Sequence, residues 1–202
     1  MTPLSCASSQ VLHVTPPSGL SDFAMSPDLT DSVITLRPFN REDLPALYAA
    51  TQESLKMLCA WMTWCTPAYS IDDCCAFLSQ TSVEWENDKS YNFAIINAHD
   101  DALIGSIALN QIHRTHNSAN VGYWVRQSQA RRGLASRALR LVTRFGFEEL
   151  RLDRLEIVVP QGNVASQRVA QKVGAKFEGI LRRKLVLNGE SHDAIIYALV
   201  RP

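Results

Sequence analysis

The chain has 202 residues, of which 46% are hydrophobic and 20% are charged, and its formal net charge is zero. This length suits one domain with a substantial core. A net charge of zero argues against bulk attraction to nucleic acid or to an anionic membrane. No apolar run approaches the roughly 20 residues that a membrane helix needs, and we expect no signal peptide.

The cysteines and histidines indicate neither a disulfide framework nor a metal site. There are 5 cysteines, two of them adjacent, and no C-x-x-C spacing is present. The 5 histidines are scattered along the chain. The pattern predicts reduced thiols in a cytoplasmic protein without a bound metal.

Composition divides the chain near its N-terminus. Residues 1–31 mix Ser, Thr, Pro and Gly with few periodic apolar positions, which predicts a disordered or loosely attached tail. Met25 is an alternative start. Residues 32–202 are expected to form the folded domain.

Periodicity and turn signals predict a mixed α/β (α+β) domain whose middle is an antiparallel meander. Predicted strands cover residues 33–39, 91–96, 102–112, 119–125, 155–159, 177–187 and 192–200. Predicted helices follow the caps Asn40, Ser70, Gly133 and Asn163, and Val164 should face inward in the last of them. The first of these should end near residues 52–54, and residues 55–69 should form a second short helix or, alternatively, an apolar lid over an acceptor groove. Gly105 predicts a bulge and Asn188-Gly189 a type I′ hairpin.

The stretch from Val121 to Ser136 joins a strand, a polar loop and a helix start. Unpaired N–H groups and the helix dipole make such a start an anion site. The loop combines charge with small residues, and it consists of Arg131, Arg132, Gly133, Leu134, Ala135 and Ser136. We therefore expect a diphosphate-bearing cofactor here. Among the arginines of the following helix, Arg137 is the best placed to meet a phosphate, although a solvated face is the alternative.

The order of elements and motifs resembles the GNAT N-acetyltransferase superfamily, and in particular the RimJ/RimL-type ribosomal-protein N-terminal acetyltransferases. The motifs that carry the resemblance are LIGSIAL (103–109), VGYWV (121–125), RRGLAS (131–136), NVAS (163–166), KVGA (172–175) and FEG (177–179). The resemblance implies a mainly antiparallel sheet of about seven strands with a splayed central pair, flanked by about four to five helices.

The resemblance also implies acetyl-CoA as the acyl donor, bound in a direct-transfer ternary complex. The pantetheine arm would pair with Trp124 and Val125, and the pyrophosphate would lie on the amides of residues 131–136. Ala130 stands where the family loop usually has Gln or Arg. Asn163 would cap its helix and hold the cofactor arm, and Ser166 would serve the leaving thiol as a general acid. The alternative for Ser166 is a bond to its own helix backbone.

The general base is less well marked than the donor site. Glu156 lies in a mostly apolar strand beside the expected cleft, where burial would raise the pKa of its carboxyl group and suit it to a base acting through water. The alternative is an ion pair with Arg154. The tyrosine that many family members carry in the last helix is absent, with Ala170 near its place, and Leu185 stands where some RimL-type enzymes have a glutamate.

Three functions follow from these expectations. The first is acetylation of a protein N-terminal α-amino group, with a ribosomal protein as partner. The second is acetylation of a small amine such as a polyamine, an amino acid or an aminoglycoside, for which Asp72, Asp73 and Glu84 are candidate acidic residues. The third is a non-catalytic acyl-CoA-binding or ribosome-associated module. A homodimer is compatible with all three.

Overall fold

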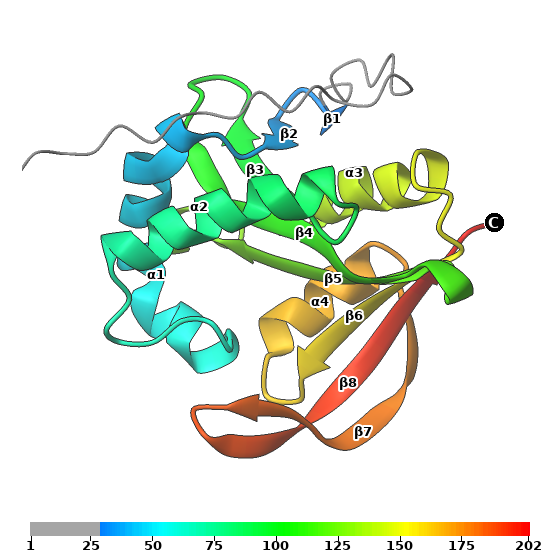
Figure 1. Ribbon diagram of the computed structural model, residues 1–202. Coiled ribbons are helices and arrows are strands. Elements are labelled where there is room, and N and C mark those ends of the chain that lie inside the picture. The colour runs from blue at the N-terminus through cyan, green and yellow to red at the C-terminus, as the bar shows by residue number, and fades with distance from the viewer. Residues whose placement is uncertain (1–28) are drawn as a thin grey trace, which may run out of the picture.

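The computed structural model describes residues 29–202, which form one eight-stranded sheet with helices on both faces (Figure 1). The strands are β1 (Leu29–Thr30), β2 (Ile34–Pro38), β3 (Tyr91–Asn97), β4 (Leu103–His113), β5 (Ser118–Val125), β6 (Arg154–Pro160), β7 (Lys176–Leu187) and β8 (Glu190–Val200). The α-helices are α1 (Leu44–Trp61), α2 (Ile71–Glu86), α3 (Leu134–Glu148) and α4 (Val164–Lys172). Single 3₁₀ turns are η1 (Arg41–Asp43), η2 (Arg114–His116) and η3 (Gln127–Gln129).

The sheet order is β1-β2-β3-β4-β5-β6-β8-β7, and every neighbouring pair is antiparallel except β5 and β6. The parallel pair is short, because its register joins only Ser118–Asn120 to Arg154–Glu156. Beyond these residues β5 and β6 diverge. The expected mixed sheet with a splayed central pair is therefore confirmed, with β1 as an additional strand.

The two faces of the sheet carry different helices. Along β3, Phe93 and Ile95 belong to the core that includes α3, whereas Ala94 and Ile96 belong to the core under α1 and α2. Successive strand side chains point to opposite faces, so α3 covers one face and α1 and α2 cover the other. Helix α4 packs against α3 and β6 on the α3 face.

The first two caps form as the sequence predicts. Asn40 and Ser70 each complete a capping box with the aspartate three residues later. The hairpin between β7 and β8 turns through Asn188 and Gly189 with φ values of 52° and 81°, as a type I′ turn requires. The register shift opposite Gly105 confirms the predicted bulge.

Three local predictions differ from the structure. Helix α1 continues to Trp61, so the break predicted at residues 52–54 and the separate short helix are wrong. No glycine or proline interrupts residues 46–61, and buried Ser54 accepts a bond from Gln127 N instead of ending the helix. Val164, predicted to face inward, is 51% exposed because it lies in the first turn of α4, beside its solvent-facing cap.

The described part of the sheet begins before residue 32, where the folded domain is predicted to start. Leu29 is buried, and β1 pairs with β2 through Leu29 and Thr30. Residues 1–28, which include most of the predicted tail and the alternative start at Met25, lie outside the described residues. Within residues 29–202, no helix is long and apolar enough to cross a membrane.

Candidate active site

The loop before α3 has the backbone geometry of an anion site. Gly133 caps the helix with a φ of 77°, a conformation that favours glycine. The first bond inside the helix runs from Arg137 N to Gly133 O at 3.1 Å. The N–H groups of Leu134–Ser136 therefore precede the helical ladder, where such groups bind phosphate.

Positive charge comes to this loop from two elements. Arg131 and Arg132 are exposed within the loop itself. Lys172 comes from the end of α4, and a Cβ atom built at Gly133 would lie 3.6 Å from its Nζ. Sequence reasoning missed Lys172, because nothing in the spacing of residues 133 and 172 indicates that the start of α3 meets the end of α4.

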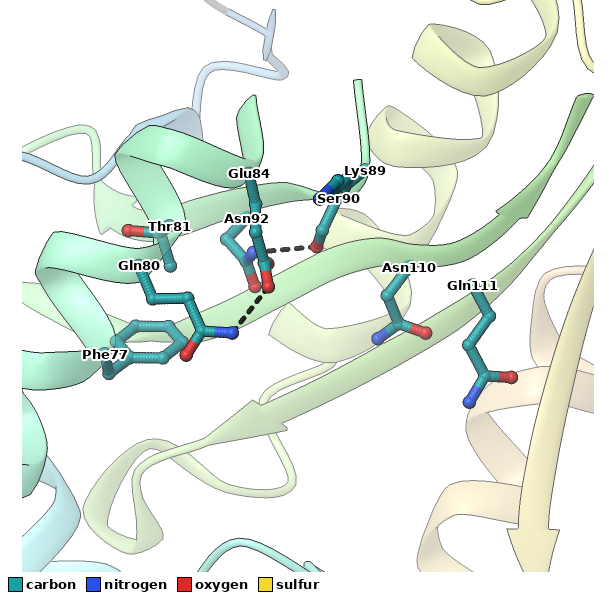
Figure 2. Close-up of a pocket in the computed structure, with 9 residues that line it drawn as sticks. All are labelled: Phe77, Gln80, Thr81, Glu84, Lys89, Ser90, Asn92, Asn110 and Gln111. Atoms are coloured by element: carbon teal, nitrogen blue, oxygen red, sulfur yellow. Dashed lines mark hydrogen bonds between the residues drawn. The ribbon is translucent and has the colours of Figure 1, made fainter. Parts of the chain in front are cut away.

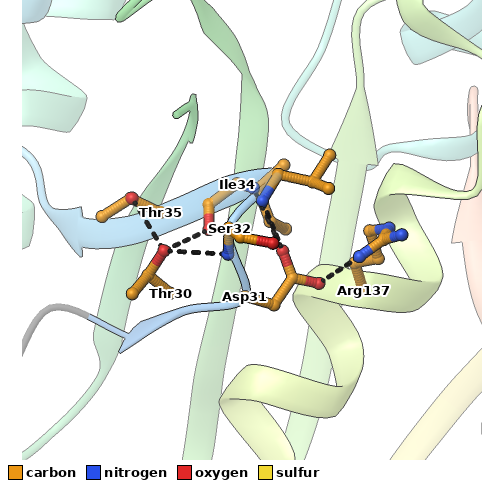
Figure 3. Close-up of polar contacts among 7 residues, drawn as sticks. Thr30, Asp31, Ser32, Ile34, Thr35 and Arg137 are labelled. Carbon is orange, nitrogen blue, oxygen red and sulfur yellow. Dashed lines mark hydrogen bonds and ion pairs between the residues drawn. The ribbon is translucent and has the colours of Figure 1, made fainter. Parts of the chain in front are cut away.

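Arg137 is engaged by another segment. Its guanidinium donates to Asp31 Oδ2 at 2.7 Å (Figure 3). Burial opposes ionisation of Asp31, but the bonds from Arg137 and from the backbone N–H groups of Ile34 and Val33 outweigh it and lower its pKa. Arg137 therefore fixes the turn between β1 and β2 onto the first turns of α3.

A second set of hydrogen bonds joins the segment just before the loop to α1. Glu53 of α1 accepts bonds from Arg126 Nε at 2.9 Å and from Ser128 N at 2.7 Å. The adjacent Ser54 Oγ accepts Gln127 N at 3.0 Å. The bonds from Arg126 and Ser128 lower the pKa of Glu53 to about 2. Helix α1 thus fixes η3, the segment that leads into the anion loop at residues 131–136.

The diverging strands leave the edge of β5 open next to the loop. On its other edge, β5 pairs Trp124 with Ser106 and Val125 with Gly105. Within the described residues, nothing in β6 pairs with β5 after Asn120. The backbone near Trp124 and Val125 is therefore available to an extended ligand arm and to a developing oxyanion.

Helix α4 contacts β5 through the side chain of Ser166. Asn163 caps it by accepting Ser166 N at 3.1 Å. The hydroxyl of Ser166 lies 2.9 Å from Tyr123 Oη, so its side-chain partner belongs to β5. Sequence reasoning missed Tyr123, whose position within the strand motif carries no sign that its ring reaches α4.

Glu156 lies on the other side of the splay point, opposite Asn120. Its side chain is 40% exposed and pairs with Arg154 at 2.9 Å. The predicted buried carboxylate is thus not found, and the ion-pair alternative is present. Arg154 also binds Glu178, and both glutamates line a pocket of about 240 Å³ that Lys184 borders too.

The α1–α2 connection brings aromatic side chains beside β5. Trp64 is 45% exposed, with its ring centroid 5.7 Å from Tyr69 and 6.5 Å from Trp124. The hairpin tip approaches the same region, since Asn188 Nδ2 donates to Cys59 O at 3.2 Å.

The three candidate acidic residues do not form one pocket. Asp73 caps α2 and Asp72 lies exposed beside it, whereas Glu84 is near the other end of the helix. Glu84 accepts a hydrogen bond from Gln80 at the rim of a polar pocket between α2 and strands β3 and β4 (Figure 2). The volume of this pocket is about 260 Å³. Within residues 29–202, no group of three or more His, Cys, Asp or Glu side chains is suited to a metal.

Residues 34–176 match the family model described as an acetyltransferase (GNAT) domain. The probable N-acetyltransferase YjcK of Bacillus subtilis is 38% identical over 118 residues, which span 58% of this chain and 65% of YjcK. The ribosomal-protein-serine acetyltransferase of Escherichia coli K12 is 32% identical over 50% of this chain and 56% of its own. The spermidine N(1)-acetyltransferase of the same organism is 27% identical over 80% of this chain and 83% of its own.

Among solved structures, Mycobacterium smegmatis RimJ in complex with CoA-disulfide superposes with a TM-score of 0.76 at 25% identity, covering 83% of this chain and 81% of RimJ. The splayed strands and the anion loop lie within the region that the family model matches. The chain therefore belongs to the GNAT acetyltransferase domain family.

Proposed function

We propose that this protein transfers an acetyl group from acetyl-CoA to a primary amine, and that the amine is the N-terminal α-amino group of a protein. The observation that carries the proposal is the edge of β5 left unpaired by β6 beyond Asn120, together with the helix start at residues 133–136 and the contact of Ser166 with β5. The CoA complex of RimJ and the similarity to the ribosomal-protein-serine acetyltransferase support it.

The donor would be held by groups from three elements. The amides of residues 131–136 would bind the pyrophosphate, with Arg131, Arg132 and Lys172 adding charge. The open edge at Trp124 and Val125 would pair with the pantetheine arm, and Asn163 would border it. Acetyl-CoA supplies the activated acetyl thioester, and no metal is needed to polarise it, because backbone N–H groups can stabilise the oxyanion.

Two side chains would move protons on opposite faces of the sheet. Ser166 contacts Tyr123 on the α4 face, whereas Glu156 shares the opposite face with Asn120. Ser166 would donate to the leaving sulfur, and Glu156 would draw a proton from the amine through water. The exposure of Glu156 suits a water-linked base, and its carboxylate also forms an ion pair with Arg154.

Charge near the cleft favours a protein N-terminus over a polyamine. A polyamine needs several unneutralised carboxylates, but Glu156 and Glu178 share Arg154 and lie beside Lys184. The exposed ring of Trp64 offers an apolar contact for the side chains of a peptide. The similarity to a spermidine acetyltransferase makes the small amine the second candidate.

The protein would work in a reducing compartment such as the cytoplasm. The described cysteines Cys59, Cys65, Cys74 and Cys75 are all free thiols.

The test measures free thiol release from acetyl-CoA with a panel of N-terminal peptides, spermidine, amino acids and an aminoglycoside. We expect peptide-dependent release and a loss of about 100-fold in kcat for Ser166→Ala. Preference for spermidine would reassign the acceptor. No acceptor-dependent release, with CoA still bound, would favour the non-catalytic module instead.

A further inference from the structure

Two hydroxyl groups, one from β5 and one from α4, lie within hydrogen-bond distance of each other. Tyr123 Oη lies 2.9 Å from Ser166 Oγ and 3.2 Å from the backbone oxygen of Ser166. Both side chains are half-buried, so the pair is only partly open to water. A tyrosine in a strand therefore contacts, through two atoms, the serine that the proposed function places beside the thioester.

The hydrogens of this pair can be counted. A phenol carries one hydrogen, and here it has two acceptors on the same residue. If Tyr123 donates to the Ser166 carbonyl, the serine hydroxyl is free to donate back to Tyr123 Oη. If Tyr123 donates to Ser166 Oγ, the serine hydrogen must point away from Tyr123 and is free for another acceptor.

Tyr123 retains its hydrogen at neutral pH. Burial of the ring raises the pKa of Tyr123 to about 12, and the opposing effect of the Ser166 bond is smaller. The phenol is thus a poor proton source but a constant hydrogen-bond donor. It can direct the serine without losing its proton.

We propose that Tyr123 is a positioning residue whose hydroxyl, by donating to Ser166 Oγ, turns the serine hydrogen toward the sulfur of the acyl donor. The inference rests on the proposed acetyl transfer. In that transfer the bond from the amine nitrogen to the acetyl carbon forms and the carbon–sulfur bond breaks. Ser166 gives its proton to the sulfur and regains one from solvent water, while the proton that the amine loses passes through water to Glu156, which releases it to solvent.

The experiment is a double-mutant cycle on the full-length protein, with Tyr123→Phe, Ser166→Ala and the pair combined. We expect Tyr123→Phe to lower kcat roughly tenfold, because one neutral hydrogen bond is lost. The dissociation constant of CoA should stay within about twofold, since the ring remains. In the Ser166→Ala background the Tyr123→Phe change should alter kcat by less than about twofold, because Tyr123 acts through the serine.

Tyr197→Phe is the matched control. Tyr197 in β8 also accepts a bond from α4, from Gln171 Nε2 at 3.1 Å, but away from Ser166. Its variant should keep the wild-type kcat. Each rate is divided by the concentration of protein that binds CoA, measured by titration. Partial unfolding therefore cannot imitate a lower kcat.

Three results would overturn the inference: an unchanged kcat in Tyr123→Phe, a further tenfold loss when that change is added to Ser166→Ala, or an equal loss in Tyr197→Phe. Each requires a wild-type enzyme that turns over. Wild-type protein that transfers acetyl to no amine would instead contradict the proposed function.

Discussion

Gly105 lies so close to the backbone of β5 that replacing it with alanine tests how rigidly the donor edge is held. A Cβ atom built at Gly105 would lie 2.2 Å from Trp124 O and 2.9 Å from Val125 Cα. Real Cβ atoms essentially never approach another heavy atom within 3.0 Å. The alanine must therefore open the β4–β5 ladder by about 0.8 Å at the proposed cofactor strand.

The size of the effect follows from which atoms must move. Overpacking costs typically 1–3 kcal/mol, and a clash with backbone cannot be relieved by a rotamer change, so we expect about 3 kcal/mol for Gly105→Ala. For a chain of this size each kcal/mol lowers Tm by about 2–4 °C, which gives a decrease of roughly 6–12 °C. Displacing Trp124 and Val125 should also weaken CoA binding.

The assay is urea unfolding followed by circular dichroism, with CoA titration of the folded protein. Gly122→Ala is the matched control in the same pair of strands, because its nearest contact would be Asn110 Nδ2 at 3.6 Å. It should change stability by no more than about 0.5 kcal/mol. If Gly105→Ala proved as stable as Gly122→Ala, β5 would not lie too close to residue 105 for a Cβ atom, and the predicted clash would be refuted.

Three further substitutions test residues that hold the elements of the proposed site in place. Glu53→Gln should weaken CoA binding several-fold and cost about 1–2 kcal/mol at pH 7, because two donors of η3 lose a charged acceptor. Its pKa is lowered from 4.5 to about 2, so the difference from wild type should be full above pH 4.5 and vanish as the pH falls toward 2 in paired urea titrations. Asp31→Asn should cost about 0.5 kcal/mol at neutral pH, since Arg137 is 41% exposed; a loss above 2 kcal/mol would show that the pair is more than a surface link. Asn163→Ala should cost about 1 kcal/mol through the lost cap and reduce kcat more than it weakens CoA binding, and wild-type turnover would remove Asn163 from the site.

Much of the local structure follows from the sequence, because caps and turns act over a few residues. Asn40 and Ser70 each have an aspartate three positions later, and Asn188-Gly189 fits only a narrow set of turns. The loop at Gly133 is predicted for the same reason, since the first amides of any helix lack partners within that helix. These signals also led to the donor site predicted at residues 131–136.

The tertiary structure decided which distant side chains contact these locally predicted elements. Lys172 approaches Gly133, Glu53 holds the segment before the loop, and Tyr123 reaches Ser166 over 43 residues of chain. The ion pair and the exposure of Glu156 depend on Arg154 and on the point where β5 and β6 stop pairing, which no periodicity encodes. Short-range chemistry sets caps, turns and strand periods, whereas side-chain partners across the cleft arise only when the sheet brings distant segments together. The sequence alone therefore determined the family pattern and predicted the anion loop, whereas the tertiary structure decided which distant side chains lie beside that loop and beside Ser166.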